Sequence, residues 1–485
     1  MKRTLSLLLA LLLVLALAPA AVQAEADVTT VIWYTPDFFN TDEGRLAEVL
    51  EYCNTLLAEK GLKLDMRLMD SGEYGEKIKL MSAGAEECDV MWTGYLSPTA
   101  QQAWEQGMVQ SLEPYMSEVP ELKDLISIYQ NGTNTDPQEG LYAIPCLQIM
   151  CDTGCFLLRK DIIDQYDLYD EVAAVKDIYD LDEFFMEVKE NYLPEGMYMI
   201  TRNPSNDFIY DDETGEYTYY PSVQNYTIDL DTMQVMEEEA RFAHELDYRK
   251  IVRKWQENGF YHPDMLTITD PLSDLWATNQ AFSSADTHKP GGEIEWYNRY
   301  GVESVQMTYG LDVLGTGAGT TLCIAHQSDK PVEALKVIQE VFTNSDLYNT
   351  LIYGFEGVDY EWVDEDHIKQ FDGCYQANGW AVGNQFLAYP LDGQTADIWE
   401  QTKEINENAY RSPIMEFSFD KTNVEAQLSN LSAIRTEYNN ILAYGLAEDP
   451  EAFMRERNDK LKAAGEDEVI AEINAQLTAF VESQK

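Results

Sequence analysis

The chain is poor in basic residues. Its 33 Lys and Arg stand against 86 Asp and Glu, so the formal net charge at pH 7 is −53 over 485 residues. A field of this sign repels phosphate backbones and anionic lipid headgroups, which argues against a nucleic-acid partner or a membrane-surface partner. The acidic run at 211–216 lies between two aromatic-rich stretches. It predicts a hairpin turn, and we expect no calcium site there.

Long hydrophobic runs are also scarce. The run at 5–18 follows the basic residues 2–3 and precedes the small residues of 22–24. This layout is typical of a Sec signal peptide, and the run is short for a membrane span. We therefore expect a secreted or extracytoplasmic mature chain, with an uncleaved anchor as the alternative. The first cysteine is Cys53, so the lipid-anchoring cysteine that directly follows a lipoprotein signal is lacking.

Cysteine and histidine are few, with seven and five residues. Cys146, Cys151 and Cys155 lie close in sequence, but no Cys-x-x-Cys pair or neighbouring histidine completes a zinc pattern. We therefore expect no metal and no cofactor. Most of the cysteines are expected to be free thiols that act as small hydrophobic residues in the core.

Catalytic motifs are lacking too. The sequence has no Gly-x-Ser-x-Gly elbow, no His-Glu-x-x-His pair and no P-loop. Asp286, Thr287 and His288 would suit part of a catalytic triad, but no nucleophile motif accompanies them. The sequence therefore favours a protein that is not an enzyme. A secreted glycoside hydrolase stays open, because among 86 acidic residues some pair will fit the carboxylate spacing of a glycosidase.

What the chain does have is a regular alternation of strand and helix patterns. Strands are predicted at 28–34, 62–68 and 89–92, and helices at 42–60, 73–82 and 97–106. This order predicts an α/β fold with a mainly parallel sheet, in which ligands bind beyond the carboxyl ends of the strands. The three strand ends carry the candidate ligand-binding residues Tyr34, Asp37, Asp70, Tyr74, Trp92 and Tyr95.

The second half of the chain is richer in helix. A long helical stretch at 231–259 is predicted to form two helices, and further helical stretches are predicted at 331–343, 423–444 and 450–484. A chain of this length needs two or three hydrophobic cores. No internal repeat and no Pro/Gly-rich linker separates the halves. We therefore expect two lobes that the chain crosses several times.

Four short motifs occur in an order that is typical of one family. They are QGMVQSLEPY at 106–115, GLYAIP at 140–145, LLRKD at 157–161 and NQAF at 279–282. Together they resemble the extracellular solute-binding proteins of ABC importers, in the group that includes maltose-binding protein. The segments 347–357 and 379–387 further resemble a subgroup with a characteristic C-terminal domain.

This resemblance implies a two-lobe, type II periplasmic-binding-protein fold with a ligand cleft between the lobes. The expected division is a signal peptide at 1–24, an N-terminal lobe of 25–148 plus 308–345, and a C-terminal lobe of 149–307 plus 346–485. Chain crossovers are expected near 145–151, 306–312 and 343–347.

The function that the resemblance implies is capture of an oligosaccharide by hinge closure. The partners would be the small-molecule ligand and the membrane subunits of an ABC importer, which receive it. We expect the binding protein to be a monomer. A peptide or another small polar solute stays open as the ligand.

An oligosaccharide site needs aromatic faces for the C–H surfaces of sugar rings and polar side chains for their hydroxyls. The resemblance adds Trp380, Thr287 and His288 as candidates in the second lobe. We therefore predict that Trp92 and Trp380 contact the ligand from opposite lobes. Weaker candidates of the same kind are Trp276, Trp296 and Tyr297.

Overall fold

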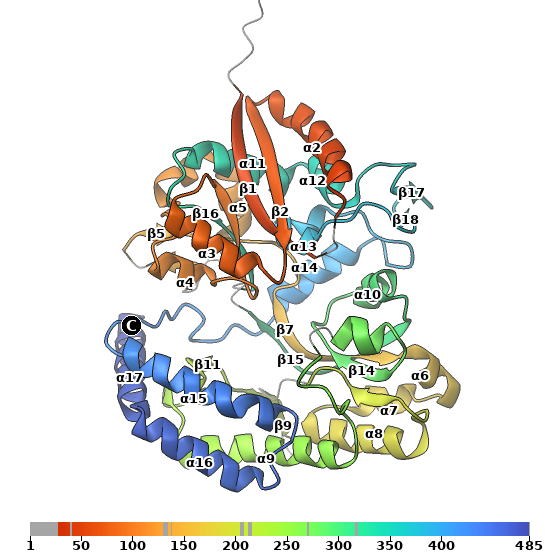
Figure 1. Cartoon of the computed structure of the whole chain (residues 1–485), viewed down its shortest axis with the longest axis vertical. Coiled ribbons are helices and arrows are strands. Elements are labelled where there is room, and N and C mark those ends of the chain that lie inside the picture. Colours follow the sequence, from red (N-terminus) through yellow and green to blue (C-terminus); the bar gives the residue numbers. More distant parts are fainter. Residues whose placement is uncertain are drawn as a thin grey trace, which may run out of the picture.

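The computed structural model describes residues 28–38, 41–129, 134–136, 138–203, 208–211, 216–268, 271–315 and 319–484. The predicted signal peptide at 1–24 lies outside these residues. The chain forms two lobes, the N-terminal one above and the C-terminal one below in Figure 1, with two long strands running between them. Within the described part of the chain, no helix combines the length and the apolar character that a membrane crossing requires.

The N-terminal lobe is built on a five-stranded sheet in the order β2-β1-β3-β16-β6. Its strands are β1 (Thr29–Asp37), β2 (Leu62–Asp70), β3 (Val90–Gly94), β6 (Ile144–Pro145) and β16 (Thr320–Ile324). β1 pairs with β2 and with β3 in parallel, as the alternation predicts, whereas β16 is antiparallel to β3 and β6. The elements around the sheet are α2 (Glu43–Ala58), α3 (Tyr74–Gly84), α4 (Ala100–Glu105), η1 (Glu113–Glu118), α5 (Pro120–Ile126), η2 (Ser127–Tyr129), β4 (Thr135–Asp136), β5 (Gly140–Leu141) and α11 (Pro331–Thr343).

The C-terminal lobe has a four-stranded sheet in the order β15-β7-β14-β8. Its strands are β7 (Cys151–Arg159), β8 (Tyr198–Ile200), β14 (Ala281–Ala285) and β15 (Ser304–Leu314). Its helices are α6 (Lys160–Tyr166), α7 (Tyr169–Ala174), α8 (Ile178–Asn191), α9 (Glu238–Glu257), η3 (Leu272–Trp276) and α10 (Gly292–Tyr300). β9 (Phe208–Asp211) and β10 (Glu216–Tyr219) are antiparallel, which confirms the predicted hairpin, and its turn lies outside the described residues.

The end of the chain forms a helical unit beside α9 (Figure 1). It comprises α15 (Glu425–Ala443), α16 (Pro450–Ala463) and α17 (Glu466–Ser483), with the short strands β11 (Ser222–Val223), β12 (Tyr226–Asp229) and β13 (Gln234–Val235) packed against it. The stretch predicted as one helix at 450–484 is two helices. Gly465 separates them because its φ of 101° is a left-handed conformation that glycine adopts readily.

The predicted lobe division needs a correction after residue 345. The elements that follow are α12 (Ser345–Tyr353), β17 (Tyr360–Trp362), β18 (Ile368–Gln370), α13 (Gly379–Val382), η4 (Gln385–Leu387) and α14 (Ile398–Asn408). Leu347, Tyr348 and Leu351 of α12 are buried in the same hydrophobic core as β1 and β3. Because that core also contains Trp399 of α14, the helices of 346–409 belong to the N-terminal core and not to the core of the C-terminal sheet.

The chain crosses between the sheets where predicted only once, between β6 and β7. The second crossing follows Leu314, since β15 stays paired with β7 up to that residue. The third lies near Tyr410, whose carbonyl accepts a hydrogen bond from the N–H of Leu314 at 2.9 Å. Hydrogen bonds tie the three crossing segments together here. The N–H of Gly315 donates to the carbonyl of Met150 at 2.7 Å, and Asn406 accepts from the N–H of Met150 at 2.7 Å.

The seven cysteines, all among the described residues, are free thiols. Six of them are buried, and only Cys374 is partly exposed. Burial raises the pKa of the Cys146 and Cys151 thiols to about 12, so both are protonated at neutral pH. The described residues hold no group of His, Cys, Asp or Glu arranged to bind a metal ion.

Candidate ligand-binding site

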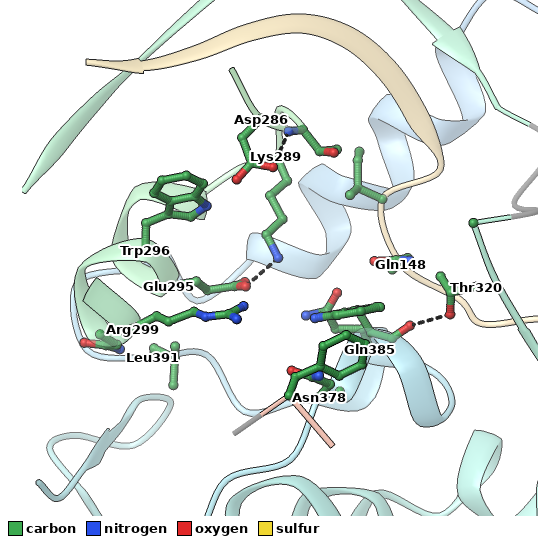
Figure 2. A pocket seen from close by; sticks show the side chains of 18 of the residues that line it. Gln148, Asp286, Lys289, Glu295, Trp296, Arg299, Thr320, Asn378, Gln385 and Leu391 are labelled. Carbon is green, nitrogen blue, oxygen red and sulfur yellow. Dashed lines mark hydrogen bonds and ion pairs between the residues drawn. The ribbon is translucent and has the colours of Figure 1, made fainter. Parts of the chain in front are cut away.

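A cavity of about 710 Å³ lies between the two lobes (Figure 2). The residues that line it from the N-terminal lobe are uncharged and include Phe38, Tyr95, Gln148, Thr320, Asn378, Trp380 and Gln385. The charged residues in the lining all belong to the C-terminal lobe and are Asp152, Arg202, Asp286, Lys289, Glu295 and Arg299. The two walls therefore differ in chemistry.

Three aromatic rings lie together in the uncharged wall, and we call this group the aromatic floor of the cavity. Phe38 directly follows β1, Tyr95 directly follows β3, and Trp380 lies on α13. The ring centroids of Phe38 and Trp380 are 5.0 Å apart, and those of Tyr95 and Trp380 are 6.2 Å apart in a stacked arrangement. Rings that already pack on one another need little reordering to accept the face of a sugar.

Two amide side chains complete this wall. Asn378 and Gln385 are each 7% exposed, and both line the cavity (Figure 2). Gln385 begins η4, where the side chain of Asn384 caps the turn by accepting from the N–H of Phe386 at 3.1 Å. The buried Oε1 of Gln385 accepts no hydrogen bond from the described residues. Because a buried acceptor without a donor costs about 1 to 3 kcal/mol, this oxygen favours a ligand that brings a hydroxyl.

The charged wall comes from the loop after β14 and from α10. Gly291 allows the chain to enter α10 because its φ is 64° and a Cβ there would lie 2.9 Å from Ile398. α10 then carries Glu295, Trp296 and, in its last turn, Arg299 toward the cavity (Figure 2). Trp296 is held edge-on against another ring, Trp276, at 5.7 Å.

The charges on this wall are partly paired. Lys289 Nζ lies 2.5 Å from Glu295 Oε2, as the dashed line in Figure 2 marks. Burial raises the pKa of the Asp286 carboxyl, while the N–H of Thr287 and the positive charges of Arg202 and Lys289 act in the opposite direction. With three acidic and three basic side chains, the lining has no formal net charge, although the chain as a whole is strongly acidic. A polyol that needs both donors and acceptors suits such a wall.

The hydroxyl of Tyr95 belongs to the uncharged wall but responds to charges on the opposite wall. The ring is 63% exposed, since it projects into the open cavity. Surrounding protein atoms still raise the pKa of its hydroxyl, and the charges of Arg299 and Arg202 on the opposite wall lower it by a smaller amount. The hydroxyl is therefore a neutral donor and acceptor at physiological pH.

Of the nine candidate residues, Tyr95, Thr287 and Trp380 line the cavity. Thr287 is exposed at the end of the C-terminal lobe's β14, as predicted, and its N–H donates to Asp286 Oδ1 at 2.7 Å. Trp380 is on the opposite lobe from the one predicted, because α13 packs with the N-terminal core.

Trp92 and Tyr74 need a correction, because both side chains are 0% exposed in the N-terminal core. The Trp92 ring lies behind the aromatic floor, 6.4 Å from Phe38 and 5.8 Å from Tyr95. Tyr74 packs behind Trp92 and donates its O–H to the Trp92 carbonyl at 2.8 Å. Both residues therefore support the floor of the cavity from beneath.

Three further candidates have local structural contacts away from the cavity lining. Tyr34 accepts a hydrogen bond from Arg67 Nη1 at 2.7 Å. Asp37 accepts from the N–H of Thr41 at 2.8 Å. Asp70 accepts from the N–H groups of Gly72 and Glu73, at 3.0 and 3.1 Å, and so holds the turn that leads into α3.

His288 also lies outside the lining. Its Nδ1 is buried and accepts or donates no hydrogen bond among the described residues, and burial lowers the pKa of its imidazole. Its neighbours on either side, Thr287 and Lys289, face the cavity instead.

The sequence reasoning missed most of the polar lining. Arg202 and Asp286 follow β8 and β14, which are parallel neighbours, so the strand-end rule applied to the second sheet would have found them. Glu295 and Arg299 are four residues apart and therefore share one face of α10. No local sequence signal identifies Gln385 or Asn378. Their position in the cavity lining depends on how residues 346–409 fold back on the N-terminal lobe.

The chain has the two-lobe fold of the type II solute-binding proteins of ABC importers, so the predicted fold class is confirmed. The predicted resemblance to this family is supported by the similarity of the chain to a carbohydrate-binding relative. Its match to solved structures extends over nearly all of the chain.

Two proteins from Streptococcus pneumoniae are similar to this chain over nearly its whole length. The chain is 24% identical over 462 residues to a carbohydrate ABC transporter substrate-binding protein of Streptococcus pneumoniae serotype 4, which covers 91% of this chain and 89% of that protein. The crystal structure of the N-glycan transport solute-binding protein NgtS from Streptococcus pneumoniae superposes with a TM-score of 0.79 at 21% identity, covering 94% of this chain and all of NgtS. NgtS has also been solved with Man1GlcNAc and with Man5GlcNAc.

More distant structures share the fold. A solute-binding protein from Bifidobacterium longum infantis that is described as binding HMO superposes with a TM-score of 0.59 at 13% identity, covering 93% of this chain and 99% of the other. A family model described as a domain of unknown function, DUF3502, matches residues 413–482, which include α15 to α17. The characteristic C-terminal domain that was predicted is therefore present, and it begins after the two segments that suggested it.

Proposed function

We propose that this chain is the extracytoplasmic binding component of an ABC importer and that it captures an oligosaccharide in the cavity between its lobes. The observation that carries the proposal is the pairing of two unlike walls around one space. An aromatic and amide wall suits the faces and hydroxyls of a sugar ring, and a charge-balanced wall opposite it suits further hydroxyls.

The mechanism follows from the three chain segments that cross between the lobes. A ligand that contacts Trp380 on one lobe can contact Arg202 or Arg299 on the other only when the lobes are closed. These additional contacts stabilise the closed state relative to the open state. Closure around a bound sugar would present both lobes together to the membrane subunits. The similarity of the chain to a carbohydrate ABC transporter substrate-binding protein and to the N-glycan-binding NgtS supports this assignment.

The experiment that tests the proposal is a thermal-shift screen of the mature protein against neutral oligosaccharides, acidic oligosaccharides and short peptides. A glycan at 100 times its Kd is expected to add about 2.7 kcal/mol of apparent stability, because it binds only the native state. Chromatography of the same mixtures is expected to return the glycan intact. Stabilisation by peptides alone would favour the peptide alternative, and steady release of smaller sugars would favour a glycoside hydrolase.

A further inference from the structure

An exposed aromatic surface adjoins the cavity on the N-terminal lobe. Trp362 is 37% exposed on β17, and Val358 and Val363 on either side of this strand are 57% and 42% exposed. Tyr389 packs beside Trp362 with its ring centroid 4.7 Å away. We call this set, Val358, Trp362, Val363 and Tyr389, the hairpin surface, since β17 and β18 form an antiparallel hairpin at the upper right of Figure 1.

The register of the hairpin connects this surface to the cavity. Tyr360 is opposite Gln370, and Trp362 is opposite Ile368. Side chains of opposite residues, and of residues two apart along a strand, point to the same face. Gln370 lines the cavity. The face that carries Gln370 at the cavity therefore carries Trp362 one step further out, about 7 Å along the strand.

A second segment makes the same connection. The N–H of Ile368 donates to the carbonyl of Pro390 at 2.9 Å, and the N–H of Asp392 donates to the carbonyl of Ile368 at 2.8 Å. Leu391 between them lines the cavity and lies near Arg299 in Figure 2. Tyr389, two residues before Leu391, packs its ring on Trp362, while Tyr360 and Ile368 are buried beneath these side chains.

We propose that the hairpin surface is a distal subsite where the outer sugars of a longer glycan stack on Trp362 after leaving the cavity. This inference rests on the proposed function, because it requires that a glycan occupies the cavity. A cavity of about 710 Å³ is of the size that encloses a drug-sized ligand, so a glycan of several sugars extends beyond it. An exposed tryptophan that continues the lining is chemically suited to the C–H face of the next ring.

The test compares two glycans of different length by calorimetric titration, Man1GlcNAc and Man5GlcNAc. Wild-type protein is expected to bind Man5GlcNAc more tightly than Man1GlcNAc. Trp362→Ala is expected to weaken Man5GlcNAc binding by roughly two- to tenfold, the range that one aromatic contact supplies, and to leave Man1GlcNAc binding unchanged. Unchanged binding of the short glycan also shows that the variant is folded and that its cavity is intact.

The matched control is Tyr179→Ala, since Tyr179 is a 48% exposed aromatic residue on α8 of the other lobe. It is expected to change neither affinity. Equal losses for both glycans in Trp362→Ala, or no loss for either, would overturn the distal subsite while leaving the cavity as the binding site. Binding of neither glycan to wild-type protein would also overturn it, and the wider screen would then decide the proposed function separately.

Discussion

Trp92→Ala and Trp380→Ala are expected to separate stability from binding, although both rings are near the same cavity. Trp92 is 0% exposed and donates its indole N–H to Thr320 Oγ1 at 3.2 Å. Truncation of such a core ring is expected to lower the free energy of unfolding by about 3 to 5 kcal/mol. The measurement is chemical denaturation of the ligand-free proteins.

Trp380 is only partly buried and its ring faces the cavity. Trp380→Ala is therefore expected to cost about 1 to 3 kcal/mol of glycan binding, which is roughly 5- to 150-fold in affinity, with a smaller loss of stability than in Trp92→Ala. Calorimetric titration of the folded variants measures this. Unchanged affinity in Trp380→Ala would remove this residue from the site, and full stability in Trp92→Ala would show that Trp92 is not part of the core.

Glu245→Gln is expected to destabilise the junction between the C-terminal helical unit and α9. Both carboxylate oxygens of Glu245 accept from Arg457 of α16, at 2.8 and 2.7 Å, and Arg249 adds a third contact at 3.2 Å. Burial by itself would raise the pKa of Glu245, but these two guanidinium groups outweigh it and lower the pKa to about 2. Removing this charge leaves Arg457 largely buried without its ionic partner.

The expected loss is about 2 to 4 kcal/mol at pH 7, less than for a fully buried pair because the Glu245 side chain is 28% exposed. The pKa of Glu245 is lower in the folded state than its ordinary value of 4.5, so its contribution is complete above pH 4.5 and is lost as the pH falls toward 2. Denaturation of both proteins between pH 7 and pH 2.5 is expected to show a difference that narrows with acidification.

The exposed pair of Lys460 and Glu437 on the neighbouring helices is the matched control for this experiment. Glu437→Gln is expected to change the free energy of unfolding by less than about 1 kcal/mol, because surface ion pairs contribute little. Equal effects of Glu245→Gln and Glu437→Gln would contradict the structural role given to the buried pair.

The sheet of the N-terminal lobe could be predicted because its pattern is local. Alternating side chains identified β2, and helical spacing identified α2. The lobe that holds 346–409 could not be predicted in this way. The apolar stripe of α12 shows that one face is buried, but it does not specify the surface that covers it.

The same limit explains why the sequence predicted Trp92 as a cavity residue beside Tyr95 and missed Phe38. Every residue of β3 is buried, so the two-residue period that separates an inner from an outer face gives no contrast there. The end of β3 does reach the cavity, since Tyr95 lines it. Which side chain at that end faces the cavity depends on tertiary packing, as the orientation of Gln385 does.

A crystal structure with the glycan that gives the largest thermal shift tests the central claim most directly. We predict one glycan between the lobes, with a sugar ring on Trp380, a hydroxyl donating to Gln385 Oε1, and contacts to at least one of Arg202 and Arg299. A glycan bound elsewhere on the surface, with the cavity between the lobes left to solvent, would contradict the proposed mode of capture.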